Sequence, residues 1–312
     1  MMIKRNNLAA AASKIHEVMN MKRIILVVMA LCLCLCGVGS AESLDVFNGF
    51  EIFPNEPVSI DLNNDGIDET ISWHNVYSTY DDYCYAEAVV LNVASGSADG
   101  FSWSEGLFNV HVYAADLDED GVYELLICGD EASDDYVTFC MHYTEYGLIP
   151  MLFADAGRGR NNEGYYSYGY GYIESIGEGA LILCGSQDIL GTRFGTRAYG
   201  LQDGRFELVD DGMWRFEYDY LEDPEIWEYA AMNPVMDISA MFLSDGDEYD
   251  GKILAGERFI ITASDKESVV YFRMQDGRQG YFFVYPDEEA GWGCYIDGFY
   301  EMDVFEFVPY AD

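Results

Sequence analysis

Short apolar stretches separated by turn-forming residues follow one another along the chain from residue 44 onward. The stretches are rich in Val, Ile, Tyr and Phe, and clusters of Gly, Asn and Asp lie between them. Such residues suit half-buried strands that end after a few positions. The pattern predicts a mainly β protein, arranged as a sandwich, barrel or propeller. Clear examples are AEAVVLNV, NVHVYAAD, YVTFCMHY, ALILCG, RFIITAS, VVYFRM and QGYFFVY.

Helical signals are confined to one region, residues 213–247, which we interpret as a helical connector. Asp223, Pro224 and Glu225 combine an N-cap residue with proline at the first helical position. They predict a short helix over IWEYAAM that ends before Pro234, and a second short helix is expected over MDISAMFL.

Residues 24–36 form an uninterrupted apolar run, IILVVMALCLCLC, preceded by Lys22 and Arg23 and followed by GVGSA. This order is the signature of a secretory signal peptide, and the run is shorter than the roughly 20 residues of a membrane-spanning helix. We expect residues 1–41 to direct export and to be cleaved, giving a secreted or cell-surface protein with no transmembrane helix; an uncleaved anchor is the alternative. A second start-like Met-Lys-Arg sequence follows residues 1–20, which we interpret as a mis-assigned extension.

The amino-acid composition and the net charge of the chain exclude some classes of protein and of function. The chain is 50% hydrophobic and 15% aromatic, which distinguishes it from acidic disordered chains. It has 56 acidic and 16 basic residues and a formal charge of −40. This sign excludes binding along nucleic-acid phosphates and attraction to anionic lipid. Excess carboxylates suit divalent cations, cationic partners or simply solubility.

The cysteines do not form a dense disulfide framework. Some lie in the predicted signal peptide (Cys32, Cys34, Cys36), and the others are widely spaced (Cys84, Cys128, Cys140, Cys184, Cys294). Cys128 and Cys184 lie in apolar runs, so we expect both to be buried as small hydrophobic residues. The sequence leaves the pairing of any single disulfide open.

A nine-residue acidic segment occurs twice. Loop A, residues 61–69, reads DLNNDGIDE, and loop B, residues 116–124, reads DLDEDGVYE; each precedes an apolar strand. A degenerate third copy, residues 174–179, reads ESIGEG. A period of about 55–60 residues with several short strands per unit is typical of propeller blades and related β-repeats. We place three such units over residues 44–212, at about 44–100, 101–157 and 158–212.

Both loops carry the ligand pattern of a calcium site. Calcium prefers six to eight oxygen ligands, mostly carboxylates and carbonyls. Side chains at positions 1, 3, 5 and 9 and the carbonyl at position 7 can converge on one ion, with glycine turning the chain at position 6. Loop A supplies these ligands from Asp61, Asn63, Asp65, the Ile67 carbonyl and Glu69, with Gly66 at the turn. Loop B supplies them from Asp116, Asp118, Asp120, the Val122 carbonyl and Glu124, with Gly121 at the turn.

The loops have two alternatives to a calcium site of this kind. An EF-hand needs glutamate at position 12 and flanking helices, but Ser72 and Ile127 occupy that position and strands flank both loops. Acidic surface turns without an ion are the second alternative. The shared glutamate at position 9 favours calcium. In the third copy Ile176 and Gly177 cannot supply side-chain oxygens, so we expect an ion-free turn there.

With these two loops and their spacing, the sequence resembles the FG-GAP and VCBS repeats of integrin-type β-propellers, whose blades carry DxDxDG-type calcium loops between strands. The resemblance covers about residues 50–212 and implies Ca²⁺ as the bound cofactor. Residues 248–312 resemble a bacterial SH3-like barrel, through a Gly-initiated strand, a Val-Tyr-Phe strand, an Asp-Gly-Arg turn and Gly280-Tyr281. That likeness implies a binding module, often for cell-wall or peptide ligands; a cap over the last repeat's edge strand is the alternative.

The tract of residues 165–172 would place Tyr166, Tyr168, Tyr170 and Tyr172 on one face of a strand. Sugar binding and packing against a neighbouring sheet both explain it.

No catalytic motif is recognised, because GxSxG, Walker, GxGxxG and HExxH patterns are all missing from the sequence. His74, His111 and His142 are isolated, and we expect them on strand faces. We therefore expect a non-enzymatic, exported calcium-binding repeat protein that binds an extracellular protein or glycan, or mediates adhesion. A secreted glycan-active hydrolase with structural calcium sites and an accessory structural protein without a ligand are the alternatives.

Overall fold

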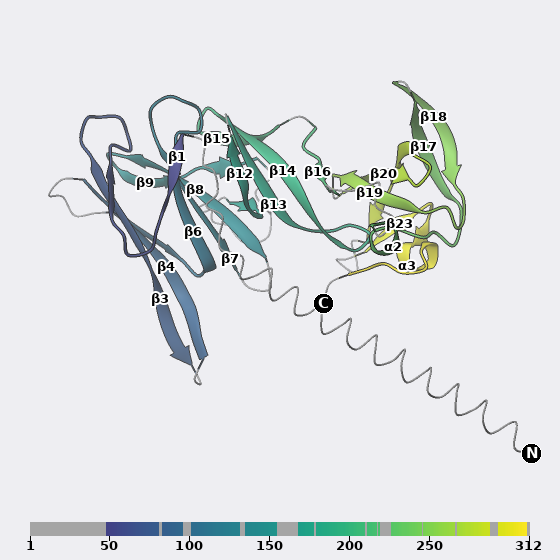
Figure 1. Cartoon of the computed structure of the whole chain (residues 1–312), viewed down its shortest axis with the longest axis horizontal. Coiled ribbons are helices and arrows are strands. Elements are labelled where there is room, and N and C mark those ends of the chain that lie inside the picture. Colours follow the sequence, from purple (N-terminus) through teal and green to yellow (C-terminus); the bar gives the residue numbers. More distant parts are fainter. Residues whose placement is uncertain are drawn as a thin grey trace, which may run out of the picture. The chain divides into compact units, whose positions relative to one another are not determined.

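The computed structural model (Figure 1) describes residues 48–80, 83–95, 101–131, 135–154, 168–177, 179–209, 211–216, 218, 226–244, 246–265, 267–287 and 293–310. These residues fall within one compact unit, Asp45–Asp312. Among the described residues, strand accounts for 61% and helix for 4%, in several antiparallel sheets, so the predicted mainly β fold is confirmed. The predicted signal peptide lies outside the described residues. Within them, no helix is both long and apolar enough to cross a membrane.

Three antiparallel meanders follow one another along the first part of the chain. The first comprises β2 (Val58–Ile60), β3 (Glu69–Tyr80), β4 (Tyr83–Ser95) and β5 (Phe101–Glu105). The second comprises β6 (Phe108–Ala115), β7 (Glu124–Asp130), β8 (Tyr136–Thr144) and β9 (Gly147–Pro150). The third comprises β12 (Tyr172–Gly177), β13 (Ala180–Asp188), β14 (Thr192–Gln202) and β15 (Arg205–Leu208). Loops A and B join the first two strands of their meanders, whereas the third acidic segment overlaps the end of β12, just before β13.

Further short strands join these meanders out of sequence order. β1 (Gly49–Ile52) pairs with β6, and β11 (Gly169–Tyr170) pairs with β8, so the second meander gains a strand on each side. β10 (Leu152–Phe153) pairs in parallel with β15. The strand pairs thus link residues that lie far apart in the sequence.

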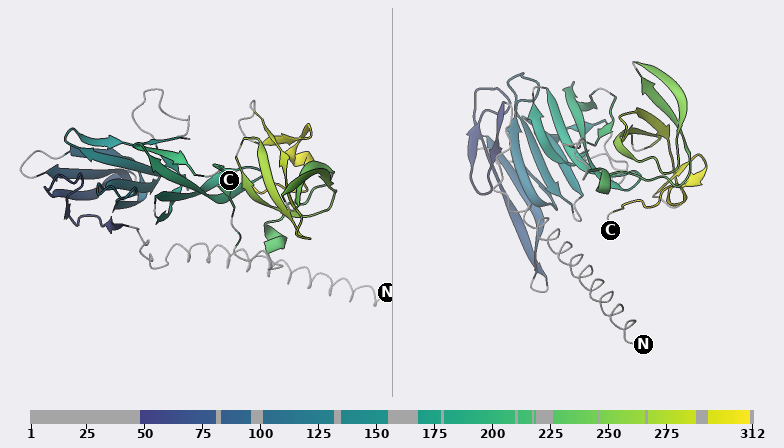
Figure 2. Two further views of the ribbon diagram at one scale, coloured as in Figure 1. Left: turned by 90° about the horizontal axis from the view of Figure 1, so that it is seen from above. Right: turned by 45° about the vertical axis from the view of Figure 1, so that its right-hand side comes forward.

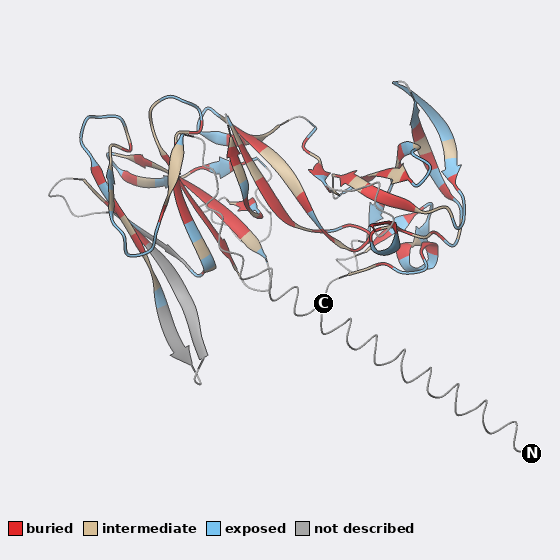
Figure 3. Cartoon of the chain, viewed as in Figure 1, coloured by how far each residue is buried: buried red, intermediate tan, exposed pale blue. Residues whose placement is uncertain are grey.

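The first two sheets pack face to face (Figure 2). Alternate residues point into their shared core, as the period of two in a strand requires. β3 contributes Ile71 and Trp73, and β6 contributes Val112 and Ala114. β7 is buried along its whole length (Figure 3), so this strand lies in the interior between packed layers.

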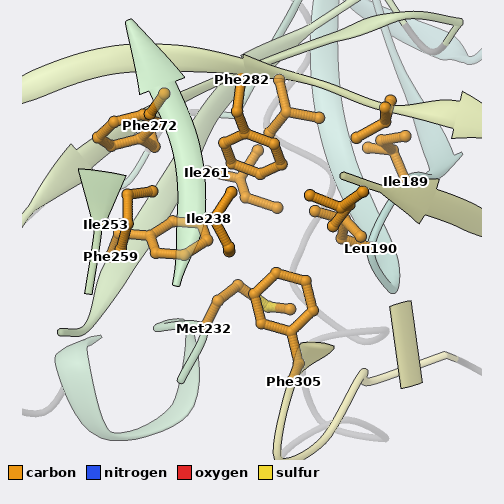
Figure 4. Packing of buried hydrophobic residues seen from close by; sticks show 14 of the residues in the cluster. Ile189, Leu190, Met232, Ile238, Ile253, Phe259, Ile261, Phe272, Phe282 and Phe305 are labelled. Carbon is orange, nitrogen blue, oxygen red and sulfur yellow. The ribbon is translucent and has the colours of Figure 1, made fainter. Parts of the chain in front are cut away.

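The C-terminal strands belong to the same hydrogen-bonded sheet as the third meander. The path runs from β14 through β16 (Trp214–Arg215), β19 (Phe259–Ser264), β20 (Val269–Met274) and β21 (Gln279–Phe283) to β17 (Ile238–Ser244) and β18 (Asp247–Ile253). A small sheet follows, made of β22 (Tyr285–Pro286), β23 (Cys294–Ile296) and β24 (Phe299–Tyr300), before α3 (Glu301–Val304). Phe259, Phe272, Phe282 and Phe305 meet in the core of this part (Figure 4).

The helical connector needs correction. α2 (Ile226–Tyr229) confirms the first predicted helix, although it is shorter than expected, and residues 223–225 lie outside the described part. The second predicted helix is wrong: residues 238–244 form strand β17. Ile238, Ala240 and Phe242 are buried in alternation, and β17 pairs with β18 and β21, so tertiary pairing overrides the weak helical signal.

The tyrosine tract differs from the expected single strand, and the third acidic segment forms the expected turn, although a shorter one. The tract is interrupted at Gly171, which has φ +111° and separates β11 from β12; Tyr166 lies outside the described residues. A side chain there would collide with the Cys184 carbonyl. Residues 174–177 belong to strand β12, and only Gly179, with φ +67°, is described as a turn residue. The third copy is therefore a tight hairpin junction, with no nine-residue loop.

Candidate metal centre

Loops A and B occupy equivalent places in the fold. Loop A joins β2 to β3, loop B joins β6 to β7, and in each loop the glutamate at position 9 is the first residue of the following strand. Leu62 and Leu117, at position 2, are 0% and 2% exposed. A buried leucine therefore anchors the start of each loop in the core, while the aspartates at position 5 face solvent.

In loop A, acidic and amide side chains hold the backbone in a tight turn. The Gly66 N–H donates to Oδ2 of Asp61 at 2.7 Å, and the Asp65 N–H donates to Oδ1 of the same aspartate at 3.0 Å. The Ile67 N–H donates to Oδ1 of Asp65 at 2.8 Å. The Oδ1 of Asn63 also accepts a hydrogen bond from the Asp65 N–H, and the Nδ2 of Asn63 donates one to Oδ2 of Asp65. These side chains consequently crowd around one turn.

Loop B repeats this frame. The Gly121 N–H donates to Oδ2 of Asp116 at 3.1 Å, and the Val122 N–H donates to Oδ1 of Asp120 at 2.8 Å. The backbone angles also recur: φ is +58° and +61° at position 4 (Asn64 and Glu119), and +85° and +87° at position 6 (Gly66 and Gly121). Two sequences that differ at several positions therefore fold into one geometry.

The glutamates at position 9 lie inside the protein. Glu69 is 0% exposed and Glu124 is 3% exposed. Their Oε2 atoms accept the N–H groups of Leu62 and Leu117, at 2.9 and 3.2 Å. Oε1 of Glu69 is buried without a hydrogen-bond partner. A buried carboxylate oxygen left unpartnered is costly, and a cation bound in the loop would satisfy it.

Carboxylates converge most closely in loop B. Oxygens of Asp116, Asp118 and Asp120 lie within 4.8 Å of one another, and Oδ1 of Asp116 is buried without a hydrogen-bond partner. Glu124 is not part of this group. The three aspartates offer the hard oxygen ligands that calcium and magnesium prefer.

The electrostatics of loop B reflect this crowding. Burial is the main reason that the pKa of Glu124 rises to about 7; the charges of Asp118 and Asp120 add to the rise, and the Leu117 N–H opposes it. Burial and the charge of Asp120 also raise the pKa of Asp118. Without a cation the loop therefore retains protons at a higher pH than free carboxylates do, and a metal ion would displace them.

The tyrosines, cysteines and histidine singled out in the sequence analysis have structural surroundings of their own. Tyr168 packs on Phe139 and Tyr170 at ring distances of 5.4 Å each, and Tyr172 lies edge-on to Tyr136 at 5.7 Å. This favours the packing interpretation of the tyrosine tract. Cys128 and Cys184 are buried as predicted, and both are free, as are Cys140 and Cys294. His111 bonds Glu51 at the surface at 2.9 Å.

The C-terminal part contains a buried polar cluster that the sequence did not reveal. Glu301 is 0% exposed and accepts hydrogen bonds from Cys294 Sγ at 3.1 Å and from the Tyr310 hydroxyl at 2.7 Å. Burial, and then the Glu301 carboxylate, raise the pKa of both Cys294 and Tyr310. The thiol thus stays protonated, which is the opposite of what a nucleophilic cysteine requires.

A hollow of about 410 Å³ lies beside α2 and the C-terminal segment. Tyr229 and Phe307 line it and are 73% and 72% exposed, and Arg258 and Glu306 add opposite charges. Exposed aromatic rings next to charged groups suit contact with a polar ligand that has apolar faces.

Comparison with known proteins identifies no relative: no family model, curated protein or solved structure matches this chain. The chain is a mainly β protein with an acidic Asp116-Asp118-Asp120 cluster that could hold a metal ion.

Proposed function

We propose that loops A and B bind Ca²⁺, and that the ions stabilise an exported repeat protein. The convergence of the Asp116, Asp118 and Asp120 oxygens within 4.8 Å carries this proposal. Their repulsion, together with the buried carboxylates at position 9, weakens the metal-free loops. A divalent ion would convert that repulsion into attraction and couple metal binding to folding. Millimolar extracellular calcium suits sites of modest affinity.

The proposed ligands are those that the nine-residue pattern assigns. They are Asp61, Asn63, Asp65, the Ile67 carbonyl and Glu69 in loop A, and Asp116, Asp118, Asp120, the Val122 carbonyl and Glu124 in loop B. The repeated hydrogen-bond frame supports one role for both loops, because equivalent side chains hold equivalent backbone groups.

We further propose that the three meanders are blades of the FG-GAP/VCBS type and that the C-terminal strands form an SH3-like binding module. The recurrence of the antiparallel meander, with an acidic loop between the first two strands in two of the three, supports the first point. The hollow beside α2, with its exposed aromatic rings, supports the second. The protein would act at the cell surface or outside the cell, binding a protein or glycan ligand.

Thermal unfolding of the exported chain, residues 42–312, tests calcium binding. In ~2 mM calcium we expect a higher unfolding midpoint than in chelator; sites saturated ~100-fold add roughly 2.7 kcal/mol each. The variant D65N/D120N should lose this rise, because asparagine keeps the acceptor oxygen of the turn but removes the charge.

The matched control is D68N/E119Q, which removes two exposed charges from the same loops at positions outside the ligand set. It should keep the rise in calcium. If the wild type unfolds at the same midpoint in calcium and in chelator, the loops are acidic turns and the proposed function fails.

A further inference from the structure

Loops A and B touch each other. The Tyr123 N–H of loop B donates to the Leu62 carbonyl of loop A at 2.9 Å. The Asn64 side chain of loop A lies over Gly121 of loop B, where an added Cβ would stand 2.9 Å from its Nδ2. The two loops therefore share a contact surface made of backbone and of one close-packed side chain.

Leu62 lies at the centre of this contact. Its N–H donates to Oε2 of Glu69, the position 9 ligand of loop A, while its carbonyl accepts from Tyr123. Leu62 is 0% exposed, so it cannot move freely. Any change in the position of Glu69 is thus transmitted to a residue that also holds loop B.

On the side of loop B, the bond reaches a ligand directly. The Tyr123 N–H and the Val122 carbonyl belong to one planar peptide group, and in a trans peptide these two groups point in opposite directions. The bond to Leu62 therefore fixes the plane of the peptide whose oxygen is the position 7 ligand of loop B. An ion on that oxygen would polarise the peptide and strengthen its N–H bond to Leu62.

In loop A, the buried Glu69 gives a second reason to expect a cation, besides the exposed acidic residues of the loop. Glu69 is wholly buried, its carboxylate is held against the loop by the Leu62 N–H, and its Oε1 has no hydrogen-bond partner. An ion that bound this oxygen would order Glu69 and, through it, Leu62.

We propose that loops A and B bind two calcium ions as a coupled pair with positive cooperativity. This rests on the proposed function. The first ion orders the contact between Leu62 and Tyr123, so the second ion binds loops that are already ordered. Repulsion between the ions opposes this effect, and the negative charges of the loops offset it. The acidic residues of the loops also outnumber the four positive charges: Asp61, Asp65, Asp68, Glu69, Asp116, Asp118, Glu119, Asp120 and Glu124.

Calcium titration of the exported chain by calorimetry, in about 0.15 M salt, tests the coupling. D65N disables loop A and leaves loop B to be measured alone, and D120N does the reverse. We expect each remaining loop to bind calcium at least about fivefold more weakly than in the wild type, and by the same factor in both variants, because coupling is reciprocal. The control D68N removes the same charge from loop A without removing a ligand, and should leave the affinity of both loops nearly unchanged.

A second pair of variants tests the contact itself. N64G keeps the positive φ of this position but removes the side chain that covers Gly121, and should lower the cooperativity. N55G is the matched control, because Asn55 also has positive φ, is exposed and lies outside both loops.

The outcomes separate the two proposals. If the wild type binds no calcium, the proposed function fails and the coupling fails with it. If the wild type binds two ions but D65N leaves the affinity of loop B unchanged, calcium binding stands and the coupling is overturned. If D68N weakens loop B as much as D65N does, the effect is one of net charge, and the coupling through Leu62 is likewise overturned.

Discussion

At the scale of one residue, the buried carboxylate of Glu69 lowers the stability of the metal-free protein, although it would bind the ion in the proposed site. One carboxylate oxygen bonds Leu62, and the other is buried with no partner. Surface aspartates such as Asp65 lose little when no ion is present, since water can solvate them. The glutamate at position 9 has no such alternative, and its neutralisation should therefore act differently in the presence and absence of metal.

We predict that E69Q stabilises the protein in chelator by about 1–3 kcal/mol, because it removes a buried charge while an amide oxygen still accepts the Leu62 N–H. In calcium the same variant should be less stable than the wild type, because a ligand is lost. Urea unfolding in both conditions measures the two effects. E119Q, at an exposed position in loop B, is the control; lower stability of E69Q in chelator would contradict the prediction.

The residues of the candidate site could be read from the sequence because their contacts are local. The side-chain hydrogen bonds that hold the turn of loop A join residues within the nine-residue segment, so the spacing of Asp61, Asp65 and Gly66 already specifies the turn. The burial of Glu69 and the contact between Tyr123 and Leu62 could not be read in this way, because both depend on how two sheets pack.

At the scale of secondary-structure elements, side-chain caps decide where strands turn. Asp265 directly follows β19, and its Oδ1 accepts the N–H groups of Glu267, Ser268 and Val269 at 2.9, 2.7 and 2.9 Å. Its Oδ2 accepts the Ser268 hydroxyl at 2.6 Å. Burial acts to raise the pKa of Asp265, but these hydrogen bonds together outweigh it and hold the pKa below the ordinary value of 3.8.

We predict that D265A destabilises the protein by about 1 kcal/mol, a modest value because the side chain is partly exposed. Since the folded-state pKa is lowered, the ionised carboxylate stabilises the fold above about pH 3.8 and this contribution is lost as the pH falls further. Denaturant unfolding at about pH 7 and about pH 3 should therefore show a smaller difference between D265A and wild type in acid. An equal difference at both values would contradict this origin.

The incorrect predictions at this scale share a cause. The segment MDISAMFL carries no clear period, and residues 238–244 become a strand because β18 and β21 offer edges to pair with. The tyrosine tract alternates like a strand, yet it breaks at Gly171, whose backbone lies against the Cys184 carbonyl. In both cases a partner distant in sequence settles the local structure, and no local pattern reports that partner.

At the scale of the whole molecule, the described residues contain two large hydrophobic cores and a smaller cluster around Trp227. One is shared by the sheets that carry loops A and B, and includes Leu62, Ile71 and Val112. The other surrounds Phe259 and Phe272 among the C-terminal strands. Both proposed calcium loops connect strands that contribute side chains to the first core. Bound ions would therefore stabilise this core most directly.

This arrangement predicts that calcium stabilises the two cores unequally. Hydrogen exchange in calcium and in chelator should show slower exchange with calcium in β3, β6, β7 and β8, because local opening of these strands disrupts the loops and is opposed by bound ions. Exchange in β19, β20 and β21 should change less, since their opening leaves both loops intact. The D65N/D120N variant should abolish the difference. If protection rises equally in all these strands, the molecule opens as one cooperative unit, and calcium then acts on its global stability rather than on the first core.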